Sequence, residues 1–375
     1  MGWGRVARLN DSFSRRALGG VLPGVACALL ALWLGVGCTP SGLLARAIRV
    51  APNRVPDFFK PSGPVVLRWP GGMMERFASG TNQVGSPAVA MHWRIVEPAD
   101  YGLEITSTHG VVGGRTNREF GFRFRMPEST RFRSRQALGT AFLLHGYGED
   151  GGAMFPWAMY LAQAGWRSVL VDLRGHGASG GRWVTFGVEE PNDLKCLRES
   201  LESAGRVEGP YVAVGHSMGA SLALRWQVVD PEVRASVALG AYAEFEKALV
   251  RLRDGYARWM PRPWVRGAAR RLPQLLGVGR EVLDTSSAIR GRSMRAFLVS
   301  GQGDVVTPPE DGSELRGLAG PGSGFLIVGD ATHEVLPYLF DQHGEVVLRW
   351  LAEVARESRS ETVAAGEGGR GQDTH

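Results

Sequence analysis

Continuous apolar runs alternate with amphipathic segments through the middle of the chain. Short runs that are apolar throughout are typical of strands covered on both faces of a sheet. The segments between them, such as "MFPWAMYLAQAG" and "DLKCLRESLESAG", have the spacing of helices. Strand and helix in alternation predict a mostly parallel sheet flanked by helices, an α/β fold. The runs are "TAFLLHG", "WRSVLVD", "YVAVGH", "RASVALG", "RAFLVSG" and "FLIVGD".

Two earlier segments and one long interval depart from this rhythm. "VAMHWRIVE" and "FGFRFRM" alternate apolar with polar residues, so we expect them to form an antiparallel edge of the sheet. About fifty residues separate "RASVALG" from "RAFLVSG", far more than a crossover between parallel strands needs. We therefore expect an inserted subdomain at about residues 244–295.

A serine stands where one predicted strand turns into a helix. Ser217 lies between Gly215 and Gly219 in the pattern G-x-S-x-G, directly after "YVAV". A strand-to-helix turn this tight strains the backbone of the serine, and a side chain at either flanking position would collide with the neighbouring chain. Such a turn is typical of a nucleophilic serine, although the bare pattern also fits a glycine-rich turn with no chemistry.

A serine hydroxyl needs a base, and the base needs an acid that orients it. His333 follows the last predicted strand and Asp304 follows the one before, so both lie at the carboxyl edge of the sheet where functional groups collect. Asp330, three residues before the histidine, is the alternative acid. The order serine, aspartate, histidine is the order of α/β-hydrolases.

The same edge offers backbone donors for a developing oxyanion. The residue after the nucleophile, Met218, and the residue after "HG" in "LLHGYGED", Tyr147, are the expected N–H donors. Losing one such donor typically costs roughly 3 kcal/mol of barrier. We expect the nearby His145, His176 and His216 to brace these turns rather than to react.

Five stretches together resemble the α/β-hydrolase superfamily, most closely its monoacylglycerol lipase and lysophospholipase (serine aminopeptidase-like) group. They span about residues 90–355 and are "HGYGED", "DLRGHGASGG", "GHSMGA", "GQGDVVTPP" and "GDATHEVL". The resemblance implies an α/β-hydrolase fold over residues 88–355, with a mostly parallel central sheet and a helical lid. Matched by motif, it implies Ser217, Asp304 and His333 as catalytic triad, with the Tyr147 and Met218 backbone as oxyanion hole.

The implied activity is hydrolysis of carboxylic esters, acyl lipids such as monoacylglycerol or lysophospholipid among them, through an acyl-enzyme. It calls for no metal and no organic cofactor. Thioesterase, peptidase or acyltransferase chemistry on the same triad stays open, as does a non-catalytic binding protein that kept the fold.

Charge changes the picture at the lid. The chain of 375 residues has a net charge of +6, and segment 244–295 alone holds twelve basic against five acidic residues. Arg258, Arg262, Arg266 and Arg270 recur at every fourth position, with Trp259 and Trp264 among them. This pattern favours a lid facing an anionic membrane surface, not a nucleic acid. A solvated basic cap is the alternative.

The N-terminus predicts export. Arg15 and Arg16 precede an apolar run at about residues 21–36, and "LGVGC" ends at Cys38 like a bacterial lipoprotein processing site. We expect residues 1–38 to be a signal peptide or anchor and Cys38 to be acylated in the bacterial cell envelope. An uncleaved anchor and ordinary secretion are the alternatives. Residues 39–87 then read as a tether and 356–375 as a disordered tail.

Overall fold

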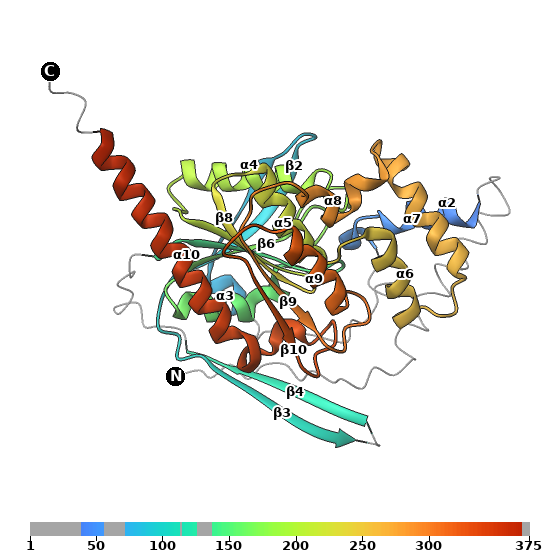
Figure 1. Cartoon of the computed structure of the whole chain (residues 1–375), viewed down its shortest axis with the longest axis horizontal. Helices are drawn as coiled ribbons and strands as arrows, with labels where there is room; N and C mark the ends of the chain where they lie inside the picture. The colour runs from blue at the N-terminus through green and yellow to red at the C-terminus, as the bar shows by residue number, and fades with distance from the viewer. Residues whose placement is uncertain (1–38, 56–71, 113–114, 126–136, 370–375) are drawn as a thin grey trace.

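A computed structural model describes residues 39–55, 72–112, 115–125 and 137–369 (Figure 1). Cys38 and the expected signal segment lie outside the described residues. The central sheet has eight strands in the order β1-β2-β6-β5-β7-β8-β9-β10. The strands from β6 to β10 are parallel, whereas β1 and β2 run antiparallel at one edge. Their bounds are β1 Ala78–Val84, β2 Val89–Val96, β5 Thr140–Leu144, β6 Arg167–Val171, β7 Tyr211–His216, β8 Val233–Leu239, β9 Ala296–Gly301 and β10 Gly324–Val328.

Helices cover both faces of this sheet, which is why its central strands are apolar throughout. On β5, the Leu143 side chain joins the core beneath helices α3 and α10, while its neighbour Phe142 joins the core beneath α4 and α5. The Phe142 ring lies edge-on to Trp226 of α5, with the ring centroids 5.1 Å apart. The expected α/β-hydrolase fold is confirmed. The bounds are α3 Phe155–Gln163, α4 Glu190–Ser203, α5 Met218–Val229, α9 Pro309–Leu318 and α10 Phe340–Gly369, with short 3-10 turns at Met74–Arg76, Gly151–Met154 and Leu336–Tyr338.

The antiparallel edge differs in part from the expectation. The segment "VAMHWRIVE" does form the edge region as β2, but its outer partner is β1. The segment "FGFRFRM" belongs instead to β4 (Arg115–Arg123), which pairs with β3 (Glu104–Val112) in a separate two-stranded sheet. Phe122 of this hairpin packs against Tyr338 and Phe340. Alternation shows that one face is buried, but it does not show which strand is the partner.

The insertion between β8 and β9 is helical, as expected. It contains α6 (Phe245–Tyr256), α7 (Arg262–Leu276), a 3-10 turn at Arg280–Leu283 and α8 (Thr285–Ile289). Helix α7 begins directly after Pro261, with Pro263 in its first turn, where a missing backbone N–H costs no hydrogen bond. These prolines therefore separate α6 from α7. We call residues 244–295 the lid.

Both expected unstructured ends contain helix. Residues assigned to the tether include α2 (Pro40–Ile48), a 3-10 turn at Pro52–Arg54 and strand β1, and α10 continues to Gly369, well into the expected tail. Helix α2 forms because Leu44 and Ala45 share a face that packs on Val265 and Ala268 of α7. Figure 1 shows α2 beside α7 at the end of the molecule opposite the free end of α10. Among the described helices, none is both long and apolar enough to cross a membrane.

Candidate active site

Ser217 sits at the turn between β7 and α5, in a backbone conformation that residues with a side chain rarely adopt. Its φ angle is +55°. A Cβ added at Gly215 would lie 2.1 Å from the Gly219 carbonyl oxygen, and one added at Gly219 would lie 2.1 Å from the Leu144 carbonyl oxygen. Both contacts are with backbone, so neither position accepts a side chain without a shift of the turn. The strained geometry lifts the serine hydroxyl out of the sheet edge.

Of the three residues expected to form a triad, His333 lies within hydrogen-bonding distance of both Ser217 and Asp304. His333 Nε2 is 2.8 Å from Ser217 Oγ, and His333 Nδ1 is 2.7 Å from Asp304 Oδ2. Asp304 and His333 are buried, and Ser217 is half-buried. Asp330, the alternative acid, is exposed in a left-handed turn with φ of +51°. The geometry is that of a nucleophile, a base and an orienting acid.

The Asp304 carboxylate is held in its ionised form by the turn that follows it. Oδ1 accepts hydrogen bonds from the backbone N–H groups of Val306 and Thr307, each at 2.8 Å, and Oδ2 accepts one from Thr307 Oγ1 at 2.7 Å. Burial raises the pKa of Asp304, but the charge and hydrogen bond of His333 and the bonds from Thr307 outweigh it and lower that pKa below its ordinary value. Sequence reasoning missed Thr307, which the hydroxyl three residues after the acid in "GDVVT" could have signalled.

The expected oxyanion loop lies against the serine. A Cβ added at Gly146 would be 3.5 Å from Ser217 Cβ, so the chain that leads into Tyr147 passes directly beside Ser217. Met218 is the first residue of α5, where backbone N–H groups have no helical partner. Glu149, which sequence reasoning missed, accepts a hydrogen bond from Gly146 N–H at 2.8 Å. The loop is thus closed on itself next to Ser217.

Two of the neighbouring histidines connect the loops. Leu173 N–H donates to His145 Nε2 at 3.0 Å, so the proton is on Nδ1, which donates to the Gly146 carbonyl at 2.7 Å. His216 Nε2 donates to the His333 carbonyl at 3.0 Å, and its Nδ1 lies 3.9 Å from Glu149 Oε2. Burial would lower the pKa of His216, but Glu149 outweighs it and raises that pKa. These contacts brace the turns that carry the reacting groups.

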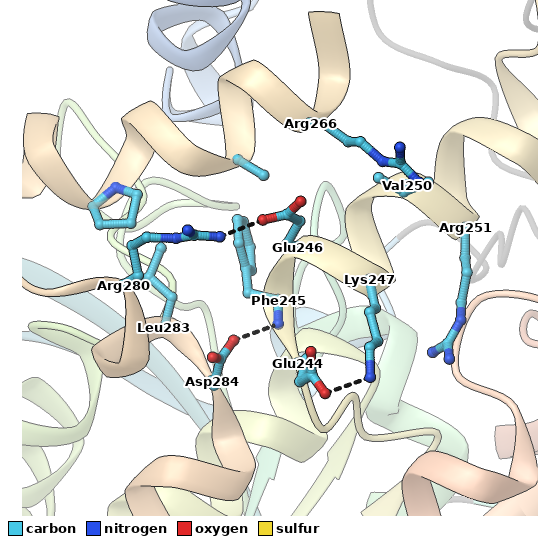
Figure 2. A pocket seen from close by; sticks show the side chains of 12 residues that line it. Glu244, Phe245, Glu246, Lys247, Val250, Arg251, Arg266, Arg280, Leu283 and Asp284 are labelled. Atoms are coloured by element: carbon cyan, nitrogen blue, oxygen red, sulfur yellow. Dashed lines mark hydrogen bonds and ion pairs between the residues drawn. The ribbon is translucent and has the colours of Figure 1, made fainter. Parts of the chain in front are cut away.

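Two cavities in the described part of the chain lie away from Ser217, Asp304 and His333. One, of about 410 Å³, lies between α6 and α7 in the lid, and Figure 2 shows Lys247, Arg251 and Arg266 around it. The other, of about 440 Å³, lies between β3, α3 and α10. Within the described ranges, no group of three or more His, Cys, Asp or Glu residues is placed to hold a metal ion.

Comparisons with known proteins give one family model and several solved structures to which the chain is similar. A family model described as serine aminopeptidase, S33, matches residues 135–300, which include Ser217 but not His333. An esterase from Pyrococcus furiosus is 18% identical, with a TM-score of 0.51 over 77% of this chain and 94% of the esterase. An esterase domain from Rhodothermus marinus is 15% identical, with a TM-score of 0.47 over 74% of this chain and 98% of that domain. No curated protein sequence matches the chain.

Proposed function

We propose that the chain, which has the α/β-hydrolase fold and matches a serine aminopeptidase family model over residues 135–300, is a carboxylic ester hydrolase in which Ser217 is the nucleophile. The observation that carries this proposal is the aligned set of contacts from Ser217 Oγ to His333 Nε2, at 2.8 Å, and from His333 Nδ1 to Asp304 Oδ2, at 2.7 Å. His333 takes the hydroxyl proton as the oxygen attacks the acyl carbonyl, and the ionised Asp304 stabilises the imidazolium that forms.

The rest of the cycle uses backbone groups and water. The N–H groups of Tyr147 and Met218 stabilise the negative charge that develops on the carbonyl oxygen. The imidazolium of His333 then protonates the leaving alcohol, which leaves an acyl-enzyme on Ser217. His333 then takes a proton from a water molecule as the water oxygen attacks this ester, and it returns that proton to Ser217 Oγ as the acid is released.

Replacement of Ser217 by alanine tests the proposal. We expect Ser217→Ala to abolish labelling by a fluorophosphonate probe and to lower hydrolysis of p-nitrophenyl butyrate by at least about a thousandfold, because loss of a triad member removes nucleophilic catalysis. Ser203→Ala, at an exposed serine on α4, is the matched control and should label like the wild type. Residual activity of Ser217→Ala above about a hundredth of wild type contradicts the assignment.

The substrate class we propose is an acyl lipid such as monoacylglycerol or lysophospholipid. Support comes from the resemblance of the site motifs to enzymes of that kind and from the apolar surface of the lid, where Trp259 and Trp264 are 49% and 42% exposed. The family model carries the name of an aminopeptidase, so a substrate panel includes aminoacyl p-nitroanilides and an acyl thioester beside graded monoacylglycerols. Faster turnover of an anilide or thioester than of any ester excludes the lipid assignment.

The location we propose is the bacterial cell envelope, with the chain exported and acylated at Cys38. The support is the sequence alone: two arginines, an apolar run, and a small residue before the cysteine. Metabolic labelling with a palmitate analogue should mark the wild type and not Cys38→Ser. A mature N-terminus other than residue 38 by mass spectrometry contradicts this proposal.

A further inference from the structure

Residues 39–55, which we call the strap, run from the lid to the loop that follows β6. At one end Thr39 caps α2, and α2 buries Leu44 and Ala45 against α7 of the lid. At the other end Asn53 Nδ2 donates to the Ser179 carbonyl at 2.7 Å, and Arg54 Nε donates to the Gly181 carbonyl at 3.0 Å. The strap therefore spans two parts of the molecule that are far apart in the sequence.

The middle of the strap contacts the expected oxyanion loop. Tyr147 Oη donates a hydrogen bond of 2.9 Å to the Ile48 carbonyl, the last residue of α2. The same ring stacks on Phe186, with centroids 5.7 Å apart, and meets His176 edge-on at 5.8 Å. The Tyr147 side chain is thus held from both sides, although it is 43% exposed. Its position is set by the strap as well as by its own loop.

The residues around Ile48 fix the strap to its neighbours. Arg49 Nη1 donates to the Leu275 carbonyl of α7 at 2.8 Å, and the Arg49 guanidinium lies over the Trp183 ring at 4.7 Å. The Arg49 carbonyl accepts a hydrogen bond from Val184 N–H at 2.8 Å. A shift of α7 would therefore move the Ile48 carbonyl, and with it the acceptor of the Tyr147 hydroxyl.

From these contacts we infer that the strap is a positioning segment for the reaction, one that holds the oxyanion loop through Tyr147 Oη and couples it to lid helix α7. The inference rests on the proposed function, because it gives Tyr147 N–H the task of stabilising the oxyanion. The Tyr147 hydroxyl touches no substrate in this role. It keeps the backbone N–H of the same residue at the distance from the acyl oxygen that stabilisation of the oxyanion requires.

A contact between α2 and α7 offers a way to loosen the strap without touching the site. A Cβ added at Gly267 of α7 would lie 2.7 Å from Ser41 Cβ and 2.3 Å from Ser41 Oγ, so Gly267→Ala pushes α2 away. Alanine favours helix more than glycine does, so the substitution does not weaken α7 by itself. Ser41→Gly removes the obstructing atoms and should restore the fit. Gly255→Ala in α6 is the matched control, since its nearest neighbour outside the helix backbone is Val305 Cγ2 at 3.4 Å.

The experiment uses the full-length protein in detergent and p-nitrophenyl butyrate as substrate. Gly267→Ala should lower kcat about tenfold with KM within about threefold, because a displaced oxyanion donor weakens transition-state stabilisation more than substrate binding. The Gly267→Ala/Ser41→Gly double variant should return to within about twofold of wild type, and Gly255→Ala should stay there. Tyr147→Phe keeps the ring and loses the hydroxyl, so it should lower kcat to a similar degree.

Combination of the two perturbations gives the decisive outcome. Tyr147→Phe and Gly267→Ala break the same connection, so the double variant should be little worse than either single one. Hydrogen exchange of residues 145–150 should rise in Gly267→Ala and fall back with Ser41→Gly, a readout that needs no activity. Full additivity, an unaffected Tyr147→Phe, or unchanged exchange overturns the inference. A wild type that neither hydrolyses an ester nor takes the fluorophosphonate probe overturns the proposed function instead.

Discussion

At the scale of single residues, the acid of the candidate triad shows how a short turn prepares a charge. Thr307 contributes both its backbone N–H and its hydroxyl to the Asp304 carboxylate, and Val306 contributes a third donor. All three bonds favour the ionised form of the Asp304 carboxyl over the protonated form. The ionised form is the one that can accept a hydrogen bond from His333 Nδ1–H. The turn "DVVT" therefore supplies the three hydrogen-bond donors that stabilise the charge of a buried aspartate.

Asp304→Asn should lower kcat by about a hundredfold or more, because an amide neither stabilises an imidazolium nor fixes the tautomer of His333. Asp330→Asn, at the exposed residue three positions before the histidine, should leave kcat within about twofold of wild type. The measurement is steady-state hydrolysis of p-nitrophenyl butyrate. If the second variant proves the more damaging, Asp330 is the acid in solution and the contact with Asp304 is not the one used.

At the scale of elements, helix α10 is docked on α3 through a buried histidine. The His343 ring is fully buried and stacks on Trp157 of α3, with centroids 5.5 Å apart and planes within 6°. Its Nε2 donates to the Leu336 carbonyl at 2.8 Å, whereas Nδ1 is buried with no partner in the structure. Burial lowers the pKa of His343 to about 4 from its ordinary 6.5, so the ring is neutral in the folded protein.

This histidine should make stability depend on pH. Above pH 6.5, the ordinary value, both folded and unfolded chains carry a neutral ring, so its packing is fully stabilising. Below pH 6.5 the unfolded chain binds a proton at this ring, whereas the folded chain binds it only near its lowered pKa of about 4. The free energy of unfolding therefore falls as the pH falls. At about 1.4 kcal/mol per pH unit, the loss between about pH 7.5 and about pH 5 is roughly 2 kcal/mol.

A comparison with His343→Phe isolates this group from the others that titrate. Phenylalanine keeps the stacking on Trp157 and loses the hydrogen bond to Leu336, so the variant should be about 1 kcal/mol less stable at about pH 7.5. Urea unfolding at both pH values measures the difference from wild type. The difference in free energy of unfolding should shift by roughly 2 kcal/mol in favour of the variant at about pH 5. A difference that is the same at both pH values excludes a buried neutral histidine.

At the scale of the whole molecule, the lid and the start of the described chain lie at one end (Figure 1). Residue 39, which directly follows Cys38, caps a helix that packs on α7. Under the proposed acylation, the lipid would be attached one residue before this helix cap. Two of the lid arginines form ion pairs within the lid, since Arg262 pairs with Asp254 and Arg270 pairs with Glu246. Replacement of these arginines would loosen the lid as well as remove charge.

The tryptophans therefore give the cleaner test of membrane contact. Trp259→Ser/Trp264→Ser should weaken binding to anionic vesicles about tenfold or more, because exposed indole rings insert at the lipid interface. Binding of the wild type should also fall with added salt, which screens the basic lid. Turnover of a short soluble ester should stay within about twofold. If vesicle binding is unchanged in the variant and insensitive to salt, the lid does not dock on the membrane.

The sequence by itself determined the features that depend on short stretches of chain. Strands β5 to β10, the elbow at Ser217, the carboxyl-edge positions of Asp304 and His333, and the lid insertion all follow from local apolar pattern, glycine spacing and loop length. These signals are local because strand burial and turn strain depend on residues within a few positions. The same signals favoured Asp304 over Asp330 as the acid, because Asp304 ends the strand before the last one in a G-x-x-D turn.

Only the tertiary structure decided which distant segments meet. Tyr147 and Ile48, separated by 99 positions, share a hydrogen bond that joins the expected tether to the expected oxyanion loop. The β3-β4 hairpin lies outside the main sheet because its aromatic face packs on Tyr338 and Phe340. Alternation along the strand cannot specify this contact. Glu149 likewise gains its proximity to His216 only when two loops close on one another. Pairings of this kind depend on shape and burial across the whole chain, and a local pattern carries no information about them.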